Sequence, residues 1–162
     1  MAGAEASGVL RALRSILTAL ALGVLAFAAI SVFLVTRNGP FTAGENTLVL
    51  VAVLVLVCFS AVPATIYTTR GLTNRIRPQA RLEPDGSIPA PLLRGFLGLR
   101  VIQAAFTEGP ALLGIVVYLL TGHWLGLVVG ALGFTRLLLL IPRASTLSDF
   151  VRDLTGQIPD IR

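Results

Sequence analysis

Residues 47–69 read TLVLVAVLVLVCFSAVPATIYTT, and no charged side chain interrupts them. An α-helix needs about 20 mostly apolar residues to cross the hydrocarbon core of a bilayer. This run is long enough, and it lacks the strict alternation of apolar and polar residues that is typical of outer-membrane β-strands. It therefore predicts a helix that spans a membrane.

The rest of the chain repeats this pattern three times. Further apolar stretches occupy about residues 15–36, 98–120 and 124–141. The turn-forming sequence RNGP at 37–40 lies between the first and second stretches, and TGH at 121–123 lies between the third and fourth. A longer polar segment, 70–97, connects the two pairs. We predict an all-α polytopic membrane protein with a single membrane domain, in which four transmembrane helices form two antiparallel hairpins.

The composition agrees with a membrane protein. Of the 162 residues, 55% are hydrophobic and 13% are charged, whereas soluble domains average about 25% charged residues. The segment AFAA at 26–29 resembles a signal-peptide cleavage site, but the apolar run continues beyond it through ISVFLV. We therefore expect the first span to be retained as an anchor helix.

The positive charges predict the orientation. All thirteen are arginines; only Arg37 lies in the two short loops, Arg136 lies inside the fourth span, and the rest lie in the termini or the 70–100 region. Because positively charged loops stay in the cytoplasm, both termini and the 70–97 segment are predicted to be cytoplasmic. The absence of lysine beside abundant alanine and glycine indicates a GC-rich bacterial genome, so the predicted location is the bacterial cytoplasmic (inner) membrane.

This topology explains the net charge of +5, which is then poor evidence for nucleic-acid binding. Anionic lipid headgroups are expected near Arg70, Arg75, Arg77 and Arg81. The 70–97 segment carries four prolines and a PDG turn that can close as a small hairpin around Asp85–Gly86, so we expect a solvated connector. One alternative is that the 70–97 segment docks a soluble partner. Another is that the protein forms a homo-oligomer.

The C-terminal segment 145–155 has helical periodicity. Leu147, Phe150, Val151 and Leu154 follow at i, i+3, i+4 and i+7, and Thr146 is spaced from Asp149 as an N-cap residue would be. We predict a short amphipathic helix that lies on the inner membrane surface.

Glycines and prolines mark packing and bending positions within the spans. Gly122, Gly126 and Gly130 recur every four residues, which predicts a smooth face that another helix approaches closely. Pro63 and Pro110 interrupt the second and third spans, and each is expected to bend its helix because proline removes one backbone hydrogen bond.

Glu108 is the residue that raises the question of function. It lies about ten residues into the third span, near the middle of the bilayer, where a carboxylate is rare and usually has a partner. Arg136 is as far after Gly122 as Glu108 is before it, so an antiparallel hairpin brings both to the same depth and permits an ion pair. Gln103, Thr107 and Ser60 lie at positions from which they can add oxygen ligands.

Two interpretations of Glu108 stay open. In the structural one, an ion pair with Arg136 fixes the third span against the fourth. In the functional one, Glu108 binds a proton or cation, with the nearby oxygen atoms as further ligands, and Arg136 extends toward the inner surface instead.

Residues 102–120, IQAAFTEGPALLGIVVYLL, resemble the carboxylate-bearing helix of the proteolipid c subunits of rotary ATPases. Glu108 stands where the ion-carrying glutamate of that family stands, and RPQ at 77–79 is similar to the polar loop of the family. The second span departs from the pattern, because it has none of the closely spaced glycines of the family's inner helix. The resemblance implies a ring-forming subunit that binds an ion at Glu108.

The sequence offers little for catalysis. Cys58 is the one cysteine and His123 the one histidine, and no phosphate-binding, dinucleotide or nucleophile-elbow motif is present. We therefore expect no enzyme activity, no cofactor and no metal. The first hypothesis is a structural or accessory membrane protein, and the alternative is a proton- or cation-handling subunit built around Glu108.

Overall fold

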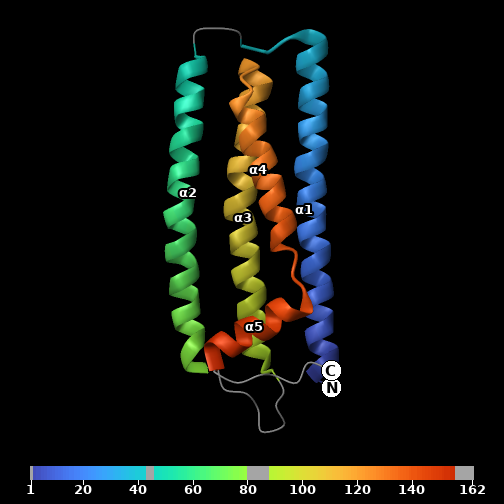
Figure 1. Ribbon diagram of the computed structural model, residues 1–162, viewed down its shortest axis with the longest axis vertical. Helices are drawn as coiled ribbons and strands as arrows, with labels where there is room; N and C mark the ends of the chain where they lie inside the picture. Colours follow the sequence, from blue (N-terminus) through green and yellow to red (C-terminus); the bar gives the residue numbers. More distant parts are fainter. Residues whose placement is uncertain (1, 43–45, 80–87, 156–162) are drawn as a thin grey trace.

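The computed structural model of the chain describes residues 2–42, 46–79 and 88–155. Within these ranges it contains α-helices, one short 3-10 helix (η1) and no strand, which confirms the all-α prediction (Figure 1). The elements are α1 (Ala2–Asn38), α2 (Thr47–Ile76), η1 (Arg77–Gln79), α3 (Ala90–Thr121), α4 (Leu125–Leu140) and α5 (Ala144–Thr155).

Three of these helices, α1, α2 and α3, are long and apolar enough to cross a membrane. The fourth candidate is α4, which has 16 residues and reaches the required length only together with α5, across a bend of 76°. The described part of the chain therefore has three helices that can span a membrane, or up to four if the bent pair counts as one.

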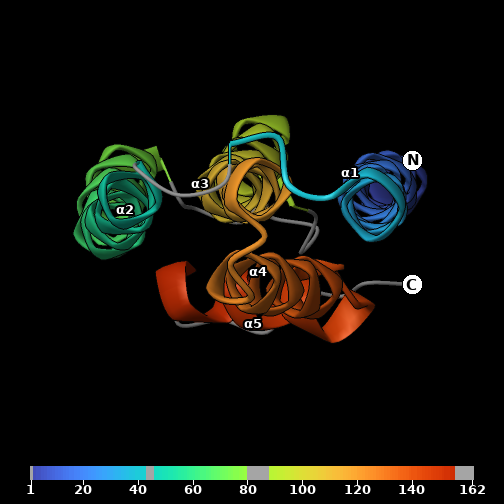
Figure 2. The same cartoon turned by 90° about the horizontal axis from the view of Figure 1, so that it is seen from above.

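Helix α3 is the centre of the fold. Figure 2, which looks along the bundle, shows α1 and α2 on opposite sides of α3, with α4 and α5 packed on one face of that row. The predicted pairing of the first two spans as a hairpin is not confirmed, because the main contacts of α1 are with α3 and α4. Helices α3 and α4 pack side by side as predicted, and they form the most extensive contact among the described helices.

The segment predicted as a long loop, 70–97, is largely helical at both ends. α2 continues to Ile76, and α3 already begins at Ala90, with Pro89 as its N-cap and Pro91 in its first turn. Proline is well tolerated at a helix start because the first N–H groups have no intrahelical acceptor, so these two prolines begin α3 within the segment that we predicted as a connector. The predicted hairpin at Asp85–Gly86 and the lipid contact of Arg81 lie outside the described residues.

The helices are longer than a bilayer core requires. With 37 and 32 residues, α1 and α3 measure about 55 and 48 Å, against a hydrocarbon thickness of about 30 Å. Their excess length lies at the end where α5 crosses the bundle (Figure 1), which we call the α5 end. There α5 buries Leu147 and Val151 completely and packs Phe150 against Phe96, with ring centroids 5.2 Å apart and ring planes tilted by 54°.

This packing forms one end of the apolar core, which we call the α5-end cluster. Its members come from the first turns of α1, from the start of α3 and from α5: Leu10, Leu13, Ile88, Leu92, Leu93, Phe96, Leu147 and Val151. The amphipathic helix predicted from the C-terminal periodicity is therefore confirmed. Its apolar face, however, contacts protein, where we had expected it to contact lipid.

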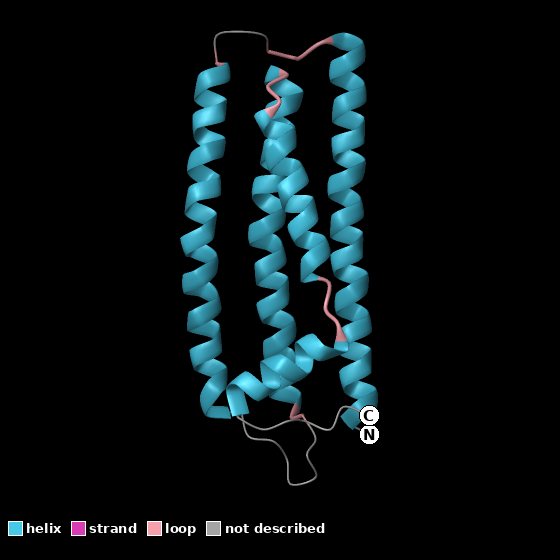
Figure 3. Cartoon of the chain, viewed as in Figure 1, coloured by secondary structure: helices cyan, strands magenta, loops and turns pink. Residues whose placement is uncertain are grey.

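The connection between α4 and α5 is an extended stretch, drawn in pink in Figure 3, that runs beside α1. Pro142 is fully buried, and its carbonyl oxygen accepts a hydrogen bond of 3.0 Å from Nε of Arg14. Thr146 is the third residue of α5 and not its N-cap, and its Oγ1 accepts a 3.2 Å bond from the backbone N–H of Arg143. The threonine thus caps the helix start from inside the first turn.

Candidate functional site

The seam between α3 and α4 determines where the intramembrane polar residues lie. Gly126 and Gly130 are buried in it, as predicted: a Cβ atom on Gly126 would overlap the carbonyl oxygen of Gly114, and one on Gly130 would lie 2.9 Å from Ile115. Gly122 does not belong to this face. It ends α3 in the left-handed conformation, with φ of 70°, which glycine adopts without strain.

Two further glycines complete the seam, and the sequence analysis missed them. A Cβ atom on Gly114 would lie 2.7 Å from the carbonyl oxygen of Gly126, and one on Gly133 would overlap the side chain of Ala111. The available signal was Gly133, three residues after Gly130 and therefore on nearly the same helix face, together with Gly114 on the facing helix. Such close backbone approach is the usual basis of helix association in lipid.

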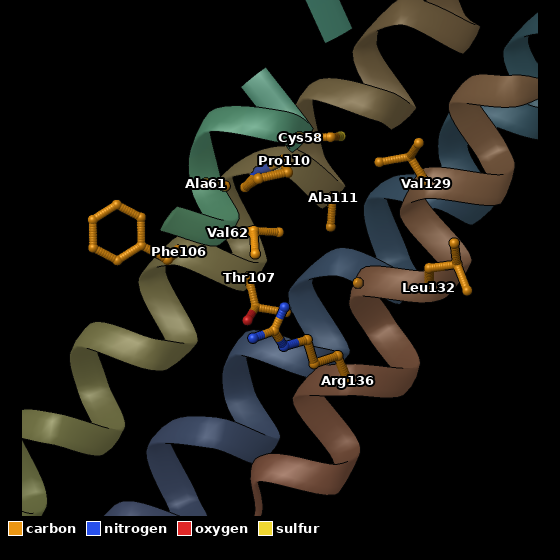
Figure 4. Close-up of a pocket in the computed structure, with 11 residues that line it drawn as sticks. Cys58, Ala61, Val62, Phe106, Thr107, Pro110, Ala111, Val129, Leu132 and Arg136 are labelled. Atoms are coloured by element: carbon orange, nitrogen blue, oxygen red, sulfur yellow. The ribbon is translucent and has the colours of Figure 1, made fainter. Parts of the chain in front are cut away.

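A cavity of about 260 Å³ opens beside this seam, between α2, α3 and α4. Figure 4 shows its lining, in which Thr107 and Arg136 supply polar atoms and Cys58 faces it from α2. The remaining lining residues are apolar or glycine: Ala61, Val62, Phe106, Pro110, Ala111, Val129, Leu132 and Gly133.

Glu108 does not line this cavity. The depth argument holds approximately, since Thr107, next to Glu108, shares the cavity with Arg136. One residue along a helix, however, is a rotation of about 100°. The side chain of Glu108 therefore points in a different direction from that of Thr107, and it is not among the residues that line the cavity.

The predicted ion pair is consequently not formed. Among the described residues, the ion pair that the structure contains joins Arg152 and Asp149 on α5, at 3.3 Å, and both side chains are exposed. Glu108 is partly buried and Arg136 is exposed near the lower end of α4.

The three predicted oxygen ligands do not converge on Glu108 either. Thr107 is buried, and its hydroxyl donates to the carbonyl oxygen of Gln103, one turn earlier, at 2.8 Å. The side-chain oxygen of Gln103 accepts from Arg100 at 3.3 Å. Ser60 is exposed and donates to the carbonyl oxygen of Val57 in its own helix.

Arg100 is a polar residue of this region that the sequence analysis did not single out. Its guanidinium lies 5.4 Å from the centre of the Phe96 ring, and its Nε atom is buried with no hydrogen-bond partner. The i, i+4 spacing of Phe96 and Arg100 on α3 was the available signal for this cation–π contact.

Both prolines that were predicted to bend helices, Pro63 and Pro110, lie inside uninterrupted helices.

No group of three or more histidine, cysteine, aspartate or glutamate side chains that could hold a metal occurs in the described part of the chain. Comparison of the chain with protein families, with curated proteins and with solved structures finds no match.

Proposed function

We propose that this protein is a four-span component of the bacterial cytoplasmic membrane with a structural or accessory role and no catalysis of its own. In this arrangement α1 to α4 cross the bilayer, and the α5 end, with both termini, faces the cytoplasm. The connection between α2 and α3 offers a surface to a soluble partner.

The observation that carries this proposal is the pairing of the polar groups within the apolar region. The hydroxyls of Thr107 and Ser60 and the amide of Gln103 bond within their own helices, and none contributes to a shared site around Glu108. Close helix packing occurs instead at the glycines of the α3–α4 seam, where an added Cβ atom would meet main-chain atoms of the facing helix. Such an interior holds helices together, whereas ion conduction needs oxygen atoms that converge on a carboxylate.

The charge distribution supports the proposed orientation. Arg37 lies at the end of the bundle opposite α5, while nine described arginines lie at or near the α5 end (Figure 1): Arg11, Arg14, Arg70, Arg75, Arg77, Arg94, Arg100, Arg143 and Arg152. Positively charged segments are retained on the cytoplasmic side.

Cysteine labelling tests this orientation. In a Cys58→Ser background, a membrane-impermeant maleimide added to intact spheroplasts is expected to label Asn38→Cys strongly and Asn74→Cys only after the membrane is opened. Both asparagines are exposed and lie at opposite ends of the bundle. Labelling of Asn74→Cys in intact spheroplasts, with none of Asn38→Cys, would reverse the topology.

A second candidate function follows from a different observation. Glu108 lies mid-helix, about 20 Å before the end of α3, and no ion pair joins it to Arg136. A carboxylate at this depth without a cationic partner is a candidate carrier of a proton or cation. An assembly of several copies around Glu108 would then complete the site.

Proton flux in proteoliposomes separates the two functions. With a potassium diffusion potential and an internal pH dye, vesicles with the wild-type chain are expected to acidify no faster than protein-free vesicles, and Glu108→Gln is expected to behave identically. Glutamine keeps the shape of the side chain and removes its charge, so it is a matched control. A flux in the wild type that Glu108→Gln abolishes, together with a ring-sized species on a native gel, would establish the second function.

A further inference from the structure

A second cavity, of about 500 Å³, lies where α4 ends and the chain turns into α5. It is formed by the last turn of α4, the connection 141–143, the first turn of α5 and one side chain of α1, Arg14. It is separate from the cavity beside the α3–α4 seam, with which it shares no lining residue.

The polar side of this cavity is cationic. Arg14 and Arg143 line it, and no acidic side chain of the described residues does. The Nε atom of Arg14 donates a hydrogen bond of 3.0 Å to the carbonyl oxygen of Pro142, which positions the guanidinium at the cavity. Arg143 is exposed and is the last residue before α5.

Further donors lie beside these two guanidiniums. Ser145 and Thr146 line the cavity from the first turn of α5, a helix of 12 residues. The backbone N–H of Thr146 already donates to the carbonyl oxygen of Arg143 at 3.0 Å, so the first turn of α5 contributes chiefly through its helix dipole, which favours an anion. Together with the guanidiniums of Arg14 and Arg143, this dipole gives the polar side of the cavity a positive potential that suits a phosphate.

The other side of the cavity is apolar and is formed by the last turn of α4. Leu138 and Leu139 line it and remain 45% and 81% exposed. A ligand with a phosphate at the arginines could therefore lay a hydrocarbon chain against these leucines. Because α4 ends here, the cavity lies at the depth expected for lipid headgroups in the proposed topology.

We propose that this cavity binds an anionic phospholipid of the cytoplasmic leaflet. The guanidiniums of Arg14 and Arg143 hold the phosphate, and one acyl chain lies along Leu138 and Leu139. Two cations with no acidic neighbour favour a headgroup of net negative charge over a zwitterionic one. This inference rests on the proposed function in one respect, namely that α4 crosses the bilayer.

Native mass spectrometry of the full chain in mild detergent tests the site. After addition of equal amounts of phosphatidylglycerol and phosphatidylcholine, the wild type is expected to retain phosphatidylglycerol preferentially. Arg143→Gln is expected to lower this retention about fivefold to tenfold, as for the loss of one charge-assisted contact. Arg152→Gln, which removes the same charge from an exposed position on α5, is the matched control and is expected to bind as the wild type does.

Further measurements separate lipid binding from a change in stability and from binding of free phosphate. Arg14→Gln is measured together with its unfolding temperature, because it also loses the bond to Pro142; Arg143→Gln has no such bond to lose. Equal retention by Arg143→Gln and Arg152→Gln would overturn the proposal. So would displacement of the lipid by millimolar inorganic phosphate, which would identify the ligand as free phosphate. Failure of the proposed function is a separate result, seen as release of the chain from membranes without detergent.

Discussion

Replacement of Gly126 by alanine is expected to destabilise the protein by about 1–3 kcal/mol, the range measured for overpacked interiors, and by more in Gly126→Val. The added Cβ atom would overlap the carbonyl oxygen of Gly114 and lie 2.8 Å from the backbone nitrogen of Tyr118. Both obstacles are main-chain atoms, so no side-chain rotation relieves the overlap. The helices must separate. Thermal unfolding in detergent, followed by circular dichroism, measures the effect.

Gly98→Ala is the matched control. Gly98 also lies within a helix of the bundle, but a Cβ atom there would meet nothing within 4 Å. Alanine favours helix over glycine by about 0.5–1 kcal/mol, so this variant is expected to be as stable as the wild type or slightly more so. If both variants raised stability equally, the α3–α4 seam would not be a close backbone contact.

The glycine seam is also the part of the interior that the sequence predicted best. Spacing by four residues identified Gly126 and Gly130, because close helix packing in lipid depends on small side chains and is therefore visible in one helix alone. The same spacing misplaced Gly122. Its role, a left-handed helix end with φ of 70°, depends on where α3 stops, and hydropathy does not report that position accurately.

The exact ends of the helices and the way the helices pair were harder to predict from the sequence. Hydropathy measures how much of a helix is apolar enough for lipid, so it found the spans but not the extensions of α2 to Ile76 and of α3 back to Ala90. Loop lengths suggested that the first two spans pair. The structure separates them across α3, because a loop joins helix ends without fixing which faces meet.

The candidate site shows the same limit. Equal distances from the turn near Gly122 predicted equal depth for Glu108 and Arg136, and depth along a helix follows from residue counting. The direction in which a side chain points around the helix does not follow from this count, because a one-residue difference turns a side chain by about 100°. Thr107, one residue before Glu108, is the residue that shares the cavity with Arg136.

Leu147→Ala is expected to release α5 from the bundle while the long helices stay folded. Leu147 is fully buried in the α5-end cluster, and truncation of a buried leucine costs about 2–5 kcal/mol. Because α5 joins α4 through the extended connection 141–143 and packs mainly on α3, the loss is expected to appear as local opening. Hydrogen exchange is expected to become at least about tenfold faster over residues 147–155.

The control for this change is Leu139→Ala, which removes the same atoms from a side chain that is 81% exposed on α4 and is expected to leave the exchange of α5 unchanged. Phe96→Ala is expected to act as Leu147→Ala does, since Phe96 is the buried α3 side chain against which Phe150 packs. The two substitutions together are then expected to cost less than the sum of their separate effects, because each alone already releases the same contact surface.

If α5 were instead held by lipid, its protection from hydrogen exchange in the wild type would disappear on transfer from bilayers to detergent and would not respond to Phe96→Ala. Slow exchange in both environments, lost in both variants, would show that the apolar face of α5 belongs to the protein core and that α5 is not primarily a membrane anchor.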